Sequence, residues 1–118
     1  MSDQHQHQHQ TALAELRLRN SFNATRLFWL PVNFKEYEIN VGIQVTNDTD
    51  LSNLDKLDLS NVIDNIDDTM LQSNLLDLIV VSNLLYDYVA SYYITHDIHI
   101  DIMNFNQPVF TTKYIFKQ

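Results

Sequence analysis

Apolar and polar residues alternate most regularly in the segment EYEINVGIQVT, residues 36–46. Five apolar side chains fall on one side of it: Tyr37, Ile39, Val41, Ile43 and Val45. A period of two residues with one apolar side predicts a half-buried strand of an antiparallel sheet. The next four residues, NDTD at positions 47–50, have the composition of a turn, so we expect the strand to end there.

The C-terminal part of the chain predicts two more strands. In HDIHIDIM, residues 96–103, isoleucines at every second position from Ile98 to Ile102 alternate with polar residues. In VFTTKYIFK, residues 109–117, one side carries Phe110, Thr112, Tyr114 and Phe116. The connecting segment NFNQP, residues 104–108, is typical of a turn, and so short a link favours a β-hairpin.

The N-terminal part contains a short predicted helix and an extended arm. In TALAELRLRNSF, residues 11–22, the apolar residues have helical spacing and Thr11 is a suitable cap. We expect this helix to fade near Asn20. The segment ATRLFWLPVNF, residues 24–34, reads as extended, because Pro31 disfavours a helical conformation at the residue before it.

The middle of the chain predicts helices. The segment DLSNLDKLDLSNVIDN, residues 50–65, reads as an irregular loop with one helical turn, followed by a helix start at which Ser60 or Asn61 is the expected cap. The apolar residues that follow fall on one helical face. A long helix is predicted for residues 75–93, LLDLIVVSNLLYDYVASYY. It either continues the helix that starts at Ser60 or Asn61, or is offset from it by a kink near residues 73–74.

The long helix is apolar on nearly every side. One stripe can hold six residues: Leu75, Ile79, Leu85, Tyr86, Val89 and Tyr93. Val80 and Leu84 fall on the opposite side, among Asp77, Asn83 and Asp87. We expect so apolar a helix to be covered on both sides, and in one small domain the second cover would come from another subunit. The two charged residues argue against a membrane span.

These elements predict an α+β fold, in which an antiparallel sheet of about four strands is packed by one long helix and accompanied by a short N-terminal helix. At 118 residues the chain suits one domain, which we place at residues 11–118. Residues 1–10, MSDQHQHQHQ, resemble a His-Gln affinity tag, and we expect them to form a disordered tail. A native metal-binding tract is the alternative interpretation of these ten residues.

Two apolar segments are the expected contact surfaces: one face of the long helix and the aromatic arm at residues 27–30. The candidate interface residues are Leu27, Phe28, Trp29, Leu30, Val80, Leu84, Tyr88 and Tyr92. Tyrosine and tryptophan suit interfaces because a rigid apolar ring carries a polar tip. Packing within the core of the subunit is the alternative explanation for the tyrosines.

Composition narrows the possible classes of function. With 15 acidic and 7 basic residues, the net charge of −8 would repel a phosphate backbone, so we expect no nucleic-acid partner. The single glycine, Gly42, is too little for a Rossmann loop, a P-loop or a nucleophile elbow. The lack of cysteine removes disulfides, thiolate metal sites and cysteine nucleophiles, and it is compatible with a reducing cytoplasm. The polar N-terminus shows no secretory signal.

One group of side chains could hold a metal ion. Asp97, His99 and Asp101 project from one side of a predicted strand with His96 beside them, and carboxylates combined with imidazole can bind a divalent cation. The simpler interpretation is the solvent side of an amphipathic strand, because no further ligand can be identified. We therefore expect no catalytic residue, no metal site and no cofactor.

From Tyr37 onward the chain resembles small structural proteins of tailed bacteriophages, of the neck or tail-completion type. The resemblance lies in a strand closed by an Asp/Asn-rich loop (INVGIQVTNDTDLSN), a helix (LQSNLLDLIVVSNLLYDYV), and then a strand, a proline-containing turn and a terminal strand (HIDIMNFNQPVFTTKYIFKQ). It implies no catalysis. It implies a ring of subunits at a head–tail joint, held by sheet edges and helix faces, and it assigns no role to any individual residue.

The expected function is that of a non-enzymatic structural or assembly protein, which acts as a homo-oligomer in a virion or in the host cytoplasm and not at a membrane. A small acidic inhibitor or regulatory protein that binds a host enzyme is the first alternative, motivated by the net charge of −8. A metal-dependent enzyme that uses His96, His99 and Asp101 is the second alternative.

Overall fold

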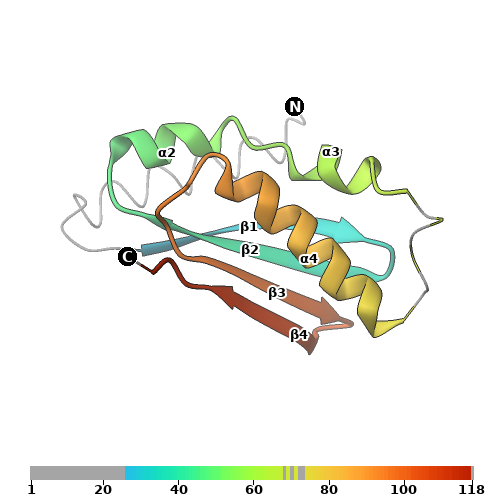
Figure 1. Ribbon diagram of the computed structural model, residues 1–118. Helices are drawn as coiled ribbons and strands as arrows, with labels where there is room; N and C mark the ends of the chain where they lie inside the picture. The colour runs from blue at the N-terminus through green and yellow to red at the C-terminus, as the bar shows by residue number, and fades with distance from the viewer. Residues whose placement is uncertain (1–25, 68, 70, 72–73, 118) are drawn as a thin grey trace.

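The computed structural model describes residues 26–67, 69, 71 and 74–117. The tag-like tail at residues 1–10 and the helix predicted from residue 11 to about residue 20 lie outside the described residues. The described part consists of a four-stranded antiparallel sheet with helices on one of its faces (Figure 1). The predicted α+β class is therefore confirmed.

The strands lie in the order β1-β2-β3-β4, and every neighbouring pair is antiparallel. Their bounds are Arg26–Phe34 for β1, Tyr37–Val45 for β2, Ile98–Asn104 for β3 and Gln107–Tyr114 for β4. The central strands β2 and β3 pair with Tyr37 opposite Asn104, so both hairpin turns lie at the same end of the sheet. The strand predicted at residues 36–46, the extended arm and the C-terminal hairpin are all confirmed.

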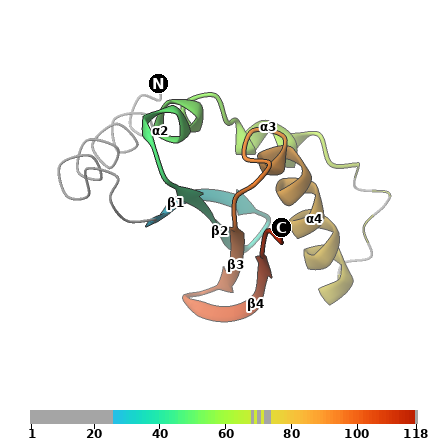
Figure 2. The same cartoon turned by 60° about the vertical axis from the view of Figure 1, so that its left-hand side comes forward.

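Three helices cover one face of this sheet within the described residues (Figure 2). Their bounds are Asp48–Leu54 for α2, Leu59–Asp64 for α3 and Leu75–Ala90 for α4. Each helix has an N-cap residue whose side chain accepts a hydrogen bond from a backbone N–H of the first turn. The N-caps of α2, α3 and α4 are Asn47, Asp58 and Asn74. At α4 the cap is reciprocal, because the Asp77 carboxylate accepts a hydrogen bond from the Asn74 N–H.

The turn expected after β2 is instead the start of a helix. Asn47 is the N-cap of α2, and its side-chain oxygen accepts a hydrogen bond from the Asp50 N–H at 2.8 Å. Asparagine and aspartate favour both turns and helix N-caps, so composition alone could not separate the two. The cap of α3 is Asp58 and not Ser60 or Asn61. The predicted long helix corresponds to α4, but it ends at Ala90, and α2 and α3 are additional to it.

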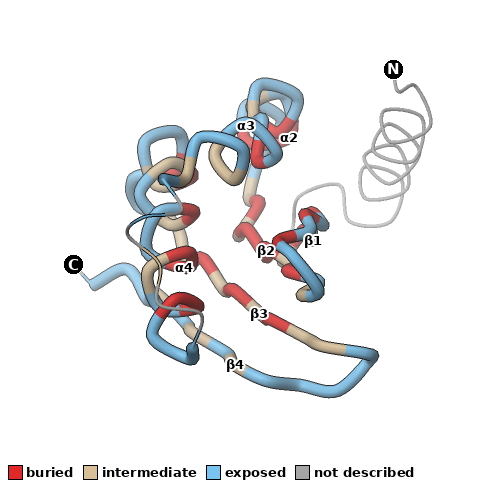
Figure 3. Tube along the Cα trace, turned by 90° about the vertical axis from the view of Figure 1, so that its right-hand side faces the viewer, coloured by how far each residue is buried: buried red, intermediate tan, exposed pale blue. Residues whose placement is uncertain are grey.

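The core lies between the sheet and the helices (Figure 3). The strand residues with no exposed surface are Ile39, Val41, Ile43, Ile98 and Ile100. From α4 the core receives Leu78, Val81, Leu85 and Val89. The inward face of β2 and β3 is thus the one that the alternation predicted, because a strand with one apolar face has only one way to bury it.

The side of α4 that faces the core agrees only in part with the predicted stripe: Leu85, Val89 and Tyr93 are buried as predicted. Leu75 and Ile79, expected inside, are 56% and 39% exposed, whereas Asp77 and Ser82 lie on the buried side. Because the helix is apolar nearly all round, its residue pattern does not determine its rotation about its own axis. None of the described helices is long and apolar enough to span a lipid bilayer.

Candidate interaction surfaces

The eight predicted interface residues fall into three places. Phe28 and Leu30 point into the core and are only 8% and 5% exposed, so we exclude them from any contact surface. Leu27 and Trp29 alternate with them on β1 and therefore face the other side of the sheet. The remaining four, Val80, Leu84, Tyr88 and Tyr92, belong to α4 or to the turn that follows it. The structure therefore does not bring the eight residues together.

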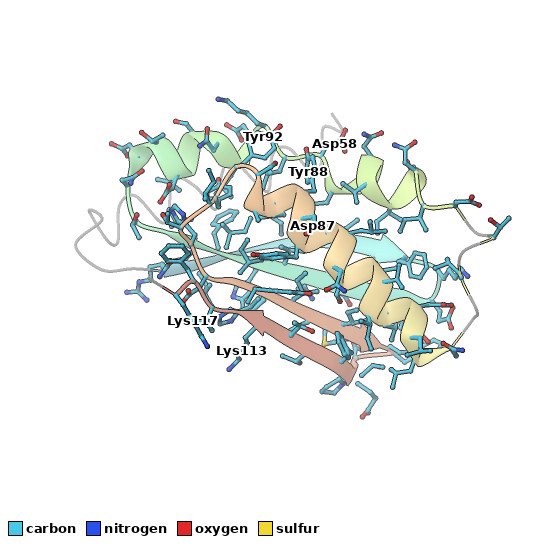
Figure 4. The ribbon with its side chains drawn as sticks, viewed as in Figure 1. Asp58, Asp87, Tyr88, Tyr92, Lys113 and Lys117 are labelled. Atoms are coloured by element: carbon cyan, nitrogen blue, oxygen red, sulfur yellow. The ribbon has the colours of Figure 1, made fainter. Side chains whose placement is uncertain are left out.

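The outward side of α4 is an exposed apolar surface, which we call the α4 surface. Its apolar members are Leu76, Ile79, Val80 and Leu84. Val80 is half-buried, and the exposed fractions of Leu76, Ile79 and Leu84 are 57%, 39% and 40%. Asp87, which Figure 4 labels on the helix, and Asn83 are the exposed polar residues of this side. The α4 surface is thus mainly apolar, with its polar residues in the C-terminal half.

The sheet face that points away from the helices, which we call the open sheet face, carries a row of residues across all four strands. The register aligns Trp29, Gly42, His99 and Lys113. The Trp29 ring lies over Gly42, where an added Cβ atom would approach the ring to 2.8 Å. The ring also meets His99 edge-on, with 6.2 Å between centroids. Glycine at position 42 therefore lets a tryptophan lie flat across the sheet, although 41% of its surface stays exposed.

Two tyrosines lie together at the C-terminal end of α4, close to Asp58 (Figure 4). The Tyr88 hydroxyl accepts a hydrogen bond from the Asp58 backbone N–H at 2.9 Å, and the rings of Tyr88 and Tyr92 meet edge-on at 5.6 Å. Burial raises the pKa of the Tyr88 hydroxyl above its ordinary value. Tyr88 therefore holds the start of α3 against α4, whereas Tyr92, 38% exposed, stays at the surface.

A polar cluster joins the β2–α2 connection to the α4–β3 connection. We call it the Asp50 cluster; its members are Thr46, Asp50, Tyr93 and His96. The Asp50 carboxylate accepts hydrogen bonds from the Thr46 N–H at 2.9 Å and from the Thr46 hydroxyl at 2.8 Å. The same oxygen lies 2.9 Å from His96 Nε2. The Tyr93 hydroxyl donates a hydrogen bond to the Asp50 carbonyl at 2.6 Å. Asp50, which is buried in the first turn of α2, therefore bonds to both the β2–α2 connection and the α4–β3 connection.

Hydrogen bonds determine the protonation state of this cluster. Burial raises the pKa of the Asp50 carboxyl, but the hydrogen bonds from Thr46 and the interaction with His96 outweigh burial and leave the pKa below its ordinary value. Burial and the Asp50 charge raise the pKa of Tyr93, so its hydroxyl keeps the proton that it donates. Asp50 and His96 are 46 positions apart, so their contact could not be predicted from residue spacing.

The side chains considered as metal ligands are directed to different partners. His96 contacts Asp50, and His99 lies against Trp29 on the open sheet face. Asp97 accepts a hydrogen bond from the Phe116 N–H at 2.9 Å. Within the part of the chain that the structure describes, no three metal-ligating side chains come together. The candidate ligands that the sequence offered are therefore not gathered into one cluster in the described part of the chain.

An aromatic stack attaches the last strand to α4. The rings of Tyr86 and Tyr114 are nearly parallel, with 4.0 Å between centroids, and the Tyr114 hydroxyl donates to the Asn83 side chain at 2.7 Å. Burial raises the pKa of Tyr114, and the nearby Asp87 charge adds to the effect. This contact holds β4 against the side of α4 and so helps to keep the α4 surface pointing outward.

Comparison of the chain with protein-family models, with curated proteins and with solved structures gave no match. The described residues offer two exposed surfaces, the α4 surface and the open sheet face, which lie on opposite sides of the layered fold. They also offer one polar cluster whose hydrogen bonds are made within the subunit. This geometry is the basis for the function proposed below.

Proposed function

We propose that this protein is a non-enzymatic structural or assembly protein that acts through self-association. The observation that carries the proposal is the α4 surface, where Leu76, Ile79 and Leu84 are 57%, 39% and 40% exposed. Neighbouring exposed apolar residues mark contact sites, whereas single ones are common on any protein. A second copy seated on this surface would remove these side chains from water, and that burial drives association.

The open sheet face supports the same proposal. Trp29 lies flat across it and is 41% exposed, and tryptophan is enriched in the centres of protein interfaces. With the α4 surface on the other side of the fold, one subunit has two different surfaces that point in opposite directions. Two such surfaces allow each subunit to contact two neighbours, which is what a closed ring requires.

We place this assembly in a tailed phage, as a head–tail joining or tail-completion component of the virion or of the infected host cytoplasm. The support is the resemblance of the chain from Tyr37 onward to proteins of that type. In this part the chain forms a strand, two short helices, a long helix and a terminal hairpin, which are β2, α2, α3, α4 and β3–β4. The proposal includes no catalysis; the hydrogen bonds of the Asp50 cluster link two connections of the fold.

Light scattering on the Leu84→Asp variant tests the proposal. Full-length protein at micromolar concentration should have a mass above that of the monomer. The variant should approach the monomer mass, because association would then bury an unpaired charge. Ser52→Asp is the matched control: it adds the same charge at an exposed position of α2 and should leave the mass unchanged. A wild-type protein that is monomeric throughout, or a Leu84→Asp variant that associates equally well, would contradict the proposal.

A small acidic protein that inhibits or regulates a host enzyme is the second candidate function, favoured by the distribution of acidic residues. Exposed aspartates follow α2 and α3 along one edge of the molecule: Asp48, Asp55, Asp58, Asp64 and Asp67. Such a row can compete with a phosphate backbone for a basic protein groove. A pull-down from host lysate separates the two functions: a stoichiometric host enzyme favours inhibition, and self-association alone favours assembly.

A further inference from the structure

The tip of the β3–β4 hairpin carries an unusually exposed aromatic ring. Among the large apolar residues that the structure describes, Phe105 has the highest exposed fraction, 83%. It is the first of the two residues that connect β3 to β4, and Figure 3 shows this turn extending away from the helices. The ring therefore gains little from packing within its own subunit.

Phe105 also has a backbone conformation that does not suit it. Its φ angle is +50°, and that of the neighbouring Asn106 is +64°. Two-residue hairpin turns with both central φ angles positive favour asparagine, aspartate and glycine, and a bulky residue in this region is strained. A strained and solvent-exposed phenylalanine contributes nothing to the stability of the subunit, which points to a contact with another molecule.

The same end of the molecule has a small pocket that is open to solvent. Its volume is about 120 Å³, and it lies between the β1–β2 turn, residues 34–37, and the start of α4 at Asn74, Asp77 and Leu78. An enclosed apolar cavity of about 150 Å³ holds benzene, so this smaller, open pocket has room for part of one ring. Phe34, Tyr37 and Leu78 supply its apolar lining, and the remaining lining residues are polar or charged.

The register of the sheet places the ring and the pocket at one end. Tyr37, which lines the pocket, pairs with Asn104, the residue before Phe105. Leu75 and Leu76, 56% and 57% exposed, belong to the same helical turn as the pocket residues Asn74, Asp77 and Leu78, and Leu76 is also a member of the α4 surface. Because Phe105 and the pocket lie at the same end of the molecule, two copies related by a two-fold axis can each place Phe105 in the pocket of the other.

We propose that Phe105 of one copy inserts into the pocket between the β1–β2 turn and α4 of a second copy, in a reciprocal contact. The inference rests on the proposed function and names one self-contact within it. A reciprocal contact joins two copies, and growth beyond a pair would use the α4 surface or the open sheet face. The inserted ring is uncharged, so it adds no repulsion at a rim that carries Lys35, Glu36 and Asp77. Lys35, whose Nζ atom lies 5.3 Å from the centre of the Phe34 ring, is also placed to contact an incoming aromatic ring.

Photo-crosslinking at position 105 tests the contact directly. Full-length chain carrying p-benzoylphenylalanine at position 105 is mixed with an equal amount of nitrogen-15-labelled wild-type chain and irradiated. The expected product joins light position 105 to heavy peptides that contain residues 34–37 or 74–78. Crosslinks confined to one chain, crosslinks to other parts of the second chain, or no crosslink at all would each overturn the inference.

The Phe105→Asn variant gives a second readout in which stability and association change in opposite directions. Asparagine tolerates the left-handed conformation, so the thermal midpoint should stay the same or rise, whereas association should weaken at least about tenfold. Asn106→Gly, the matched control in the same turn, should leave association unchanged. If the wild type associates and Phe105→Asn associates equally well, the inference fails and the proposed function stands. If the wild type remains monomeric, both fail.

Discussion

Asp50 shows how much of the fold can depend on one side chain. It is 6% exposed, and its carboxylate, amide and carbonyl groups all make hydrogen bonds to neighbouring connections. Because the folded-state pKa of the carboxyl is lowered, Asp50 stabilises the fold above its unfolded pKa of about 3.9. This contribution is lost as the pH falls through the lower folded-state value. Asp50 is therefore expected to contribute to stability at neutral pH and to acid unfolding.

Replacing Asp50 with asparagine should lower the free energy of unfolding at pH 7 by about 1–3 kcal/mol, because a buried set of charge-assisted hydrogen bonds is lost. The difference between wild type and variant should shrink as the pH falls from about 4, where the unfolded chain takes up the proton, through the lower folded-state pKa of the Asp50 carboxyl. Urea titrations from pH 7 to pH 2.5 measure both effects. Asp64→Asn, at an exposed position of α3, is the control and should change stability by less than about 0.5 kcal/mol. An equal pH dependence in wild type and Asp50→Asn would rule out this role.

Ser82 is also a buried polar residue, but replacing it should raise the stability of the fold, whereas replacing Asp50 should lower it. Its side chain is 1% exposed, and its hydroxyl oxygen has no hydrogen-bond partner among the described residues. Replacing it with alanine removes this group and improves helix propensity, so the free energy of unfolding should rise by about 0.5–1.5 kcal/mol. Urea unfolding measures the change. Ser91→Ala is the matched control, since the Ser91 hydroxyl donates to the Tyr88 carbonyl at 2.6 Å, and stability should not increase there. A loss of stability in Ser82→Ala would refute the argument.

At the scale of the element, two consecutive leucines of α4 lie in opposite environments, one in the core and one at the surface. Leu85 has no exposed surface, whereas Leu84 is 40% exposed. Leu85→Ala should lower the free energy of unfolding by about 2–5 kcal/mol, because it leaves a cavity in the core. Leu84→Ala should change it by less than about 1 kcal/mol in the dissociated protein. Thermal and urea unfolding at low protein concentration compare the pair, and similar losses in the two variants would mean that the rotation of α4 is wrong.

The strands could be predicted from the sequence and the helices only in part. β2 and β3 alternate between apolar and polar residues, so their approximate bounds, their inward face and their place in an antiparallel sheet follow from the pattern. The pairing of β2 with β3 does not follow from the pattern, because 52 residues separate the two strands. The apolar residues of α4 surround the helix, and Asp77 and Ser82 lie on its buried side, so its orientation could be known only from its packing against the sheet. Asn47 favours a turn and a helix cap alike, so α2 was predicted only as one helical turn within a loop, and its start at Asn47 was missed.

The candidate surfaces were predictable to a smaller extent than the fold. Trp29 and Leu84 were identified from their apolar surroundings, but alternation along β1 placed Phe28 and Leu30 in the core. Phe105 was not identified, because nothing in the segment NFN shows that a phenylalanine occupies a left-handed position at an exposed turn. Its role depends on backbone geometry and exposure, and both are properties of the folded chain.

At the scale of the whole molecule, apolar surface and net charge have opposite effects on association. The described residues expose apolar side chains on α4, on the open sheet face and at the end that carries Phe105. The net charge of −8 makes identical copies repel one another, and salt screens this repulsion while leaving apolar contacts intact. Association of this chain should therefore strengthen as the salt concentration rises.

Sedimentation equilibrium of the full-length protein tests self-association most directly. The protein is measured over nanomolar to high micromolar concentrations at low and high salt, with a chelator present so that the His-Gln tail cannot bridge chains through metal ions. The expected result is a mass that rises reversibly from monomer to a defined oligomer within the micromolar range, at lower protein concentration when salt is high. A mass that remains that of the monomer at every protein and salt concentration would contradict the claim that association is the function of this protein.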